Sequence, residues 1–114
     1  MKVLTCLIAG TLFCAGLSMA HAQQTGEEPA PSPEQFAKGA NLFAHTCSHC
    51  HGPEMVNPGN FSFDLRKFPH DGRERFFNSV RNGKKAMPPW KDILHQDEIE
   101  AIWAYVRTGG VAPQ

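Results

Sequence analysis

The sequence has few cysteines, no net charge and no long apolar run. Its 114 residues include 11 basic and 11 acidic ones, which excludes the strongly basic surface of a typical nucleic-acid-binding domain. The longest apolar segment, residues 3–17, is shorter than the roughly 20 residues needed to span a bilayer. No segment alternates apolar and polar residues as a strand does. The length and this pattern predict a single all-α domain.

The first 22 residues have the three parts of a secretory signal peptide. Lys2 gives the positive start, an apolar centre follows, and Ala20-His21-Ala22 is a small-x-small cleavage site. We therefore expect export to the periplasm with removal of residues 1–22, and no stable membrane insertion afterwards. Cys6 and Cys14 leave with the signal, and neither follows the Gly or Ala that a lipid-bearing cysteine requires.

Two parts of the mature chain lack a helical period. Residues 23–31 are rich in Gln, Glu and Pro, which predicts a flexible leader before a domain spanning 32–110. Residues 52–69 predict a long loop that carries several aromatic side chains, among them Phe63 and Phe68. A loop of this length usually wraps a functional object.

Three segments carry helix signals. Ser32, followed by a proline at the first helical position and a glutamine at the third, predicts a helix from Ser32 to about His45. Asp71 and Glu74 resemble a second capping-box pair, which predicts a helix over 72–82. A third helix is expected over 96–107, where apolar residues recur at i, i+3, i+4 and i+7.

The chemistry of the chain is concentrated in Cys47-Ser48-His49-Cys50-His51, the Cys-x-x-Cys-His pattern of covalent haem attachment. Two cysteines three residues apart on a helical turn point to one side. Both sulfurs can then bond the two vinyl groups along one edge of a single haem c. His51, directly after the second cysteine, is held beneath the iron, which predicts that it is the proximal ligand.

Two other sites use similar residues. A thioredoxin-like dithiol would need a sheet-containing domain, and no strand pattern precedes Cys47. A structural zinc site would need two further ligands, which the mature chain could supply only from its histidines. These histidines form no second clustered pair, so haem is favoured over zinc.

The sixth iron ligand must come from the opposite side of the haem. Met87 fits, because the prolines that follow it favour a stiff, extended backbone. Met55 lies only four residues past His51 and cannot readily cross to that side, whereas His70 and His95 remain alternatives. A His51–Met87 pair would favour ferrous iron and leave no vacant position, which predicts electron transfer rather than catalysis.

Taken together, the signal, the Cys47–His51 motif, Met87 within 83–90 and the last helix resemble the small class I cytochromes c. The similarity covers about residues 34–107 and implies three to four helices and loops wrapped around haem. It also implies that Gly39 and Phe43 of the first helix cross Tyr105 of the last.

The resemblance also assigns roles around the haem. It implies that a proline carbonyl orients the proximal histidine, with Pro58 as the candidate, and that Arg66 and Trp90 contact the haem propionates. The last helix departs from the pattern of many relatives, because His95 stands where a serine or threonine cap is common.

The expected function is one-electron transfer between a periplasmic or membrane dehydrogenase and a terminal oxidase or another cytochrome. The runs 63–66 and 87–90 are also similar to soluble cytochromes that accept electrons from quinoprotein alcohol dehydrogenases. A haem-containing enzyme, a sensor or a haem subunit of a dehydrogenase complex is the alternative.

Overall fold

The computed structural model describes residues 27–57 and 62–114, so the predicted signal peptide and Pro58 lie outside the described residues. Within them the chain forms α-helices and two short 3₁₀ helices, and no β-strand. The prediction of an all-α fold is confirmed. None of the described helices is long and apolar enough to cross a membrane. The elements are α1 (Pro33–Thr46), α2 (Ser48–His51), η1 (Pro53–Met55), η2 (Leu65–Lys67), α3 (Arg73–Asn82) and α4 (Gln96–Arg107).

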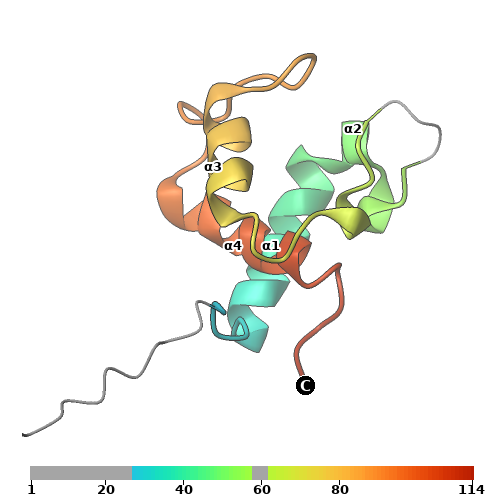
Figure 1. The fold of residues 1–114 in the computed structure, drawn as a ribbon, viewed down its shortest axis with the longest axis vertical. Coiled ribbons are helices and arrows are strands. Elements are labelled where there is room, and N and C mark those ends of the chain that lie inside the picture. The colour runs from blue at the N-terminus through green and yellow to red at the C-terminus, as the bar shows by residue number, and fades with distance from the viewer. Residues whose placement is uncertain (1–26, 58–61) are drawn as a thin grey trace, which may run out of the picture.

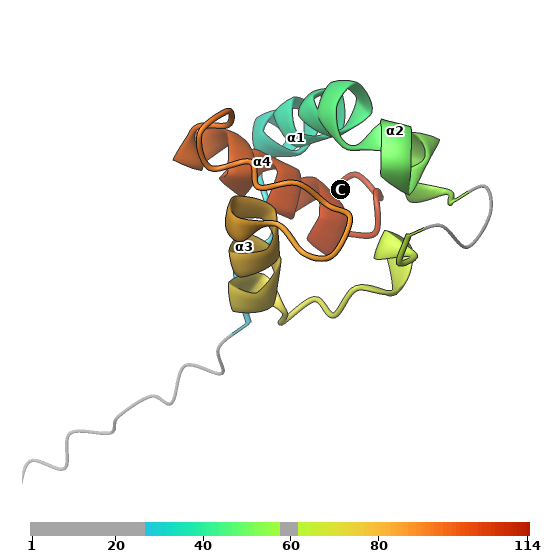
Figure 2. The ribbon, with the colours of Figure 1, turned by 90° about the horizontal axis from the view of Figure 1, so that it is seen from above.

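The first and last helices cross at the centre of the molecule (Figures 1 and 2). A Cβ atom added to Gly39 of α1 would lie 1.9 Å from the carbonyl oxygen of Ala101 in α4, so only glycine permits this approach. On the same side, the Tyr105 ring packs between Phe36 and Phe43, with centroid distances of 5.4 and 5.3 Å. The predicted crossing through Gly39, Phe43 and Tyr105 is confirmed.

The core continues from α4 towards α3 through aromatic side chains. Every residue from Ala101 to Val106 is buried, which explains why the apolar period of this segment is so clear. Phe68 packs edge-on against Phe76 and Trp103, each with a centroid distance of 6.1 Å. Edge-to-face packing lets rings fill a small core without clashes.

The helix starts follow the sequence signals in two of three cases. The Ser32 hydroxyl accepts a hydrogen bond from the Gln35 backbone at 3.1 Å, as predicted. In α4 the Glu98 carboxylate accepts from the His95 backbone at 2.8 Å, so a reciprocal cap forms without serine or threonine. The predicted Asp71 cap is wrong, because α3 begins one residue later at an N-cap Gly72 with no side-chain cap.

The reason for the late start of α3 is packing. A Cβ atom at Gly72 would lie 2.7 Å from the Phe68 ring and 3.0 Å from the Pro69 carbonyl oxygen. The glycine therefore accommodates Phe68 as that ring enters the core, and the chain turns into the helix only after it. Local capping chemistry is overridden here by a tertiary contact.

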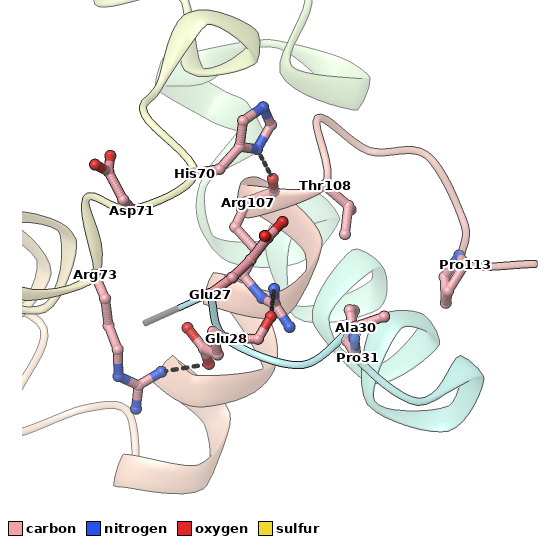
Figure 3. A pocket seen from close by; sticks show the side chains of 10 residues that line it. All are labelled: Glu27, Glu28, Ala30, Pro31, His70, Asp71, Arg73, Arg107, Thr108 and Pro113. Atoms are coloured by element: carbon pink, nitrogen blue, oxygen red, sulfur yellow. Dashed lines mark hydrogen bonds and ion pairs between the residues drawn. The ribbon is translucent and has the colours of Figure 1, made fainter. Parts of the chain in front are cut away.

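Part of the predicted leader contacts the helical domain. The Glu28 carboxylate accepts hydrogen bonds from Trp103 Nε1 at 2.8 Å and from Arg73 Nη1 at 3.0 Å, and Arg107 donates to the Glu28 carbonyl at 3.3 Å. Figure 3 shows Glu28 beside Arg73 and Arg107. Pro31 is buried. Glu28 thus bridges α3 and α4, although it precedes the expected start of the domain at Ser32.

Candidate functional site

The Cys-x-x-Cys-His motif forms one compact turn at the end of α1. The Cys47 amide donates to the Phe43 carbonyl at 2.9 Å, and the amides of Cys50 and His51 both donate to the Cys47 carbonyl at 3.2 and 3.0 Å. The helical path therefore continues through Cys47 into α2. Both cysteines and the histidine lie within this single turn, as their spacing predicts.

The two thiols have different surroundings. Both are free, with Cys50 exposed and Cys47 partly buried against the core. Burial, together with the nearby Cys50, raises the pKa of the Cys47 thiol to about 12. A dithiol redox site needs a lowered thiol pKa, so the electrostatics of this turn do not favour the thioredoxin-like alternative.

The His51 imidazole is half-buried, and its environment favours the neutral form. Burial lowers the His51 pKa, and the Phe63 backbone opposes this by raising it. The Nδ1 atom is nevertheless buried without a described partner in hydrogen-bonding geometry. A neutral imidazole with its Nε2 available is the form that binds iron.

Met87 lies in a tight turn between α3 and α4. The backbones of Lys84 and Met87 exchange two hydrogen bonds of 3.0 Å, and Lys85 adopts a left-handed φ of 55° inside the turn. Gly83, with φ of 77°, leaves room for the Met87 carbonyl, which would lie 2.7 Å from a Cβ atom there. The turn fixes the backbone from which the partly buried Met87 side chain projects.

The arrangement of the segments agrees with the predicted pair of ligands. In Figure 1 the chain between α3 and α4, which carries Met87, extends on the same side of the α1–α4 crossing as α2. The Trp90 amide donates to the Val80 carbonyl of α3 at 2.9 Å, which anchors the far end of this segment. Trp90 itself is partly buried against the core.

The loop after the motif folds back onto it. The Ser62 hydroxyl donates to the Cys50 carbonyl at 2.9 Å, and the Asn57 amide donates to the carbonyl and hydroxyl of Ser62. Phe63 follows directly and is 52% exposed. The sequence did not indicate this closure between residues 50 and 62.

The other predicted haem contacts have mixed outcomes. Arg66 is exposed, and its guanidinium forms two hydrogen bonds of 2.9 Å with the Asp64 carboxylate. Its propionate role and that of Trp90 stay predictions. Pro58 lies outside the described residues, and the backbone that acts on His51 is that of Phe63.

The alternative ligands are engaged elsewhere. Met55 is completely buried and packs, like Tyr105, against Gly110. His70 Nδ1 lies against the Arg107 carbonyl at the end of α4 (Figure 3), and His95 begins α4. Within residues 27–57 and 62–114, no three His, Cys, Asp or Glu side chains are grouped as a zinc site requires.

A hollow of about 930 Å³ lies apart from these residues, between the start of the described chain, residues 70–73 and the end of α4 (Figure 3). Its lining includes none of the predicted haem-binding residues. It is therefore separate from the candidate site.

Comparison with known proteins agrees with this geometry. Residues 34–106 match the family described as cytochrome c oxidase, cbb3-type, subunit III. Cytochrome c6 of Euglena gracilis is 37% identical over 76 residues, which cover 61% of this chain and 87% of that protein. This chain belongs to the c-type cytochromes. Like the cytochromes c6, this cytochrome is a monohaem electron carrier and not an enzyme.

Two further matches show how far the similarity extends, one over a whole cytochrome and one over part of a larger enzyme. A solved structure described as c-type cytochrome NirC has a TM-score of 0.51 and 26% identity, covering 73% of this chain and all of that one. Quinohemoprotein alcohol dehydrogenase ADH IIB of Pseudomonas putida is 36% identical over 78 residues, 66% of this cytochrome but only 11% of that enzyme. The second match therefore concerns one small part of a much larger protein.

The residues of this cytochrome fit a covalently bound haem c. Cys47 and Cys50 are free thiols on one turn, and the adjacent His51 has a buried Nδ1 with an unused hydrogen-bonding capacity. Iron-bound histidines usually donate from the second ring nitrogen, which fixes the orientation of the ring. The donor set and its surroundings are those that the motif predicts.

Proposed function

We propose that this cytochrome is an exported carrier in which Cys47 and Cys50 attach one haem c and His51 and Met87 bind its iron. The observation that carries the proposal is the pairing of two rigid turns. One presents both thiols and His51, and the other fixes the Met87 backbone by two hydrogen bonds of 3.0 Å. When bound, the haem supplies a one-electron change between ferric and ferrous iron.

The protein residues determine how that change occurs. Burial lowers the His51 pKa and so favours the neutral imidazole, which would hold the iron without first losing a proton. The Met87 thioether, as a soft ligand, favours the ferrous state. With His51 and Met87 both holding the iron, small ligands would be excluded, and the hydrogen-bonded turns that carry the two residues would limit their movement during electron transfer.

The proposed location is the periplasm, and the residue pattern of 1–22 supports it. The proposed donor is a periplasmic or membrane dehydrogenase, with a quinoprotein alcohol dehydrogenase as one candidate. The proposed acceptor is a terminal oxidase or another cytochrome. Lys84, Lys85 and Lys91 are exposed on either side of Met87 and supply positive charge for docking on acidic partner surfaces.

The ligand assignment is tested by carbon monoxide binding to the purified, exported protein. We expect wild-type protein to resist carbon monoxide and Met87→Leu to bind it, with a lower reduction potential. Met55→Leu is the matched control, because it removes the other mature-chain thioether at similar volume and should behave as wild type. Equal carbon monoxide binding by wild type and Met87→Leu would contradict Met87 as the sixth ligand.

The docking role is tested by charge reversal at Lys85. We expect Lys85→Glu to slow reduction by a quinoprotein dehydrogenase about tenfold at low salt, with the difference lost at high salt. Lys38→Glu on α1 makes the same change in net charge where the lysine already pairs with Asp97. Equal reduction rates for the two variants would contradict a docking role for the lysines of residues 84–91.

The similarity to part of a larger quinohaem enzyme favours one second candidate, a haem subunit of a dehydrogenase complex. Co-purification from the native source distinguishes a free carrier from a subunit of a complex. A carrier elutes alone at its monomer or small-oligomer size, whereas a subunit elutes with dehydrogenase activity.

A further inference from the structure

The backbone of residues 62–63 is held next to the predicted proximal ligand. The Ser62 hydroxyl bonds the Cys50 carbonyl at 2.9 Å. Ser62 thus ties the start of the returning segment to the residue before His51. The backbone of the next residue, Phe63, acts on the His51 imidazole as a hydrogen-bond partner.

The Phe63 ring has contacts of its own, with Phe68 and Arg75. It packs edge-on against Phe68, with a centroid distance of 6.3 Å and an interplanar angle of 88°. The guanidinium of Arg75, on α3, lies over both rings, 5.9 Å from the centroid of Phe63 and 4.7 Å from that of Phe68. A guanidinium over the face of an aromatic ring is attracted by the negative charge of that face.

Arg75 has no stronger described partner that would compete for it. Among the described residues, no carboxylate lies within ion-pair distance of its guanidinium. Phe68 is buried in the core against Phe76 and Trp103, so it provides a fixed base. A continuous stack thus runs from α4 through Phe68 and Arg75 to the otherwise exposed Phe63.

The His51 ring needs a hydrogen-bond acceptor for its Nδ1 atom, and the stack holds the segment that carries one. Its Nδ1 is buried without a partner in full hydrogen-bonding geometry, although the Phe63 backbone acts on it, and a buried donor that lacks an acceptor is destabilising. The Phe63 carbonyl is a backbone acceptor on the segment that Ser62 and Arg75 hold from two sides.

We propose that Arg75 is a positioning residue for the iron ligand: by stacking on Phe63 and Phe68, it keeps the Phe63 carbonyl as the acceptor for His51 Nδ1–H. This inference rests on the proposed function, since it concerns His51 bound to iron. It differs from the sequence expectation, which gave the acceptor role to Pro58. It also makes an exposed residue of α3, outside the haem-binding motif, a determinant of the reduction potential.

The direction of the effect follows from the chemistry of imidazole. Donation from Nδ1–H to a carbonyl makes the ring a stronger electron donor to iron and so favours the ferric state. When the stack is broken, the Phe63 segment is free to move away and this donation weakens. The reduction potential should then rise.

The experiment compares Arg75→Leu with Arg81→Leu in the haem-loaded protein. Arg81 is a matched control because it also lies on α3 over an aromatic ring, 5.7 Å from the centroid of Phe77, and that ring lies outside residues 62–68. We expect Arg75→Leu to shift the iron equilibrium threefold to tenfold towards the ferrous state, a rise of about 30 to 59 mV. Arg81→Leu should leave the potential unchanged, and Arg75→Lys should restore most of it.

A second readout excludes a merely structural effect. The His51 Nδ1 proton, observed by NMR in the ferrous protein, should exchange with solvent at least about tenfold faster in Arg75→Leu than in Arg81→Leu. Unfolding midpoints identify any variant that is globally destabilised. Equal potentials and equal Nδ1 exchange in the two variants would overturn the inference while leaving the proposed function intact. Wild-type protein without covalent haem would contradict both.

Discussion

The α1–α4 crossing and the two segments around the candidate haem site are built by different means. The crossing is made of buried side chains and one glycine, with Ala101 to Val106 all buried. Residues 52–57, 62–69 and 83–90 rely more on backbone hydrogen bonds, turns and left-handed residues such as Met55 and Lys85, although the Met55 and Phe68 side chains are buried. Phe63 and Val56 in the first of these segments remain 52% and 49% exposed.

This difference indicates that the helix crossing mainly stabilises the fold, whereas the segments around the site mainly serve the function. Close packing makes the crossing a rigid frame, because a core at crystal-like density tolerates little change in volume. The segments around the site instead hold particular backbone atoms in place and, apart from Met55 and Phe68, their side chains contribute less to the protein core. The crossing should therefore be sensitive to one added methyl group, whereas the site segments should be sensitive to lost polar or cationic contacts.

The sharpest test of the comparison adds a methyl group at the crossing. Gly39→Ala should lower the free energy of unfolding by about 3 kcal/mol, since the new Cβ would lie 1.9 Å from the Ala101 carbonyl oxygen. Val56→Ala, in the 52–69 segment, should cost less than about 1 kcal/mol because the side chain is half-exposed. Urea unfolding of the haem-loaded variants measures both, and equal losses would remove the distinction between the regions.

A smaller effect is expected where the start of the domain joins the frame. Glu28→Gln weakens the charge-assisted bonds to Trp103 and Arg73 and should lower the free energy of unfolding by about 1 kcal/mol. Glu27→Gln removes the same charge from an exposed neighbour and should have little effect. The thermal midpoints of the two variants compare them; if they coincide, residues 27–31 are not part of the frame.

The smallest expected effect is a pH dependence of stability, which comes from the Arg73–Glu100 ion pair between α3 and α4. Burial alone would raise the Glu100 pKa, but the hydrogen bonds from Arg73 and Gln96 outweigh it and lower that pKa below 4.5. Since the folded-state pKa is depressed, the contribution is full at neutral pH and is lost as the pH falls below about 4.5 through the folded-state value. It should be under about 1 kcal/mol.

Urea midpoints between pH 7 and pH 3 measure this contribution. Wild-type protein should lose more stability over that range than Glu100→Gln does. Parallel profiles would show that the Arg73–Glu100 pair adds nothing to the link between α3 and α4.

Much of the frame could be predicted from the sequence because its signals are local. The Ser32 cap and the apolar period of α4 gave helices within a residue or two of those observed. The Asp71 cap failed because the Phe68 ring requires glycine at the next residue. The role of Glu28 could not be predicted, since its partners Arg73 and Trp103 lie 45 and 75 residues away in sequence.

The site was predicted in its motif but not in its surroundings. The spacing of Cys47, Cys50 and His51 places all three on one turn whatever the rest of the chain does. The proposed support of His51 depends instead on Ser62, which bonds Cys50 only once the loop closes, and on Arg75 of α3, which lies over the Phe63 ring. The polar Ser62 between two phenylalanines was the one signal in the sequence, and it names no partner.

The measurement that tests the central claim most directly is extraction of the exported protein with acidified acetone. Thioether bonds to Cys47 and Cys50 predict that the haem absorbance stays with the precipitated polypeptide, and that a Cys47→Ser, Cys50→Ser double variant releases any haem it binds. Haem that passes into the acetone from the wild-type protein would contradict the account.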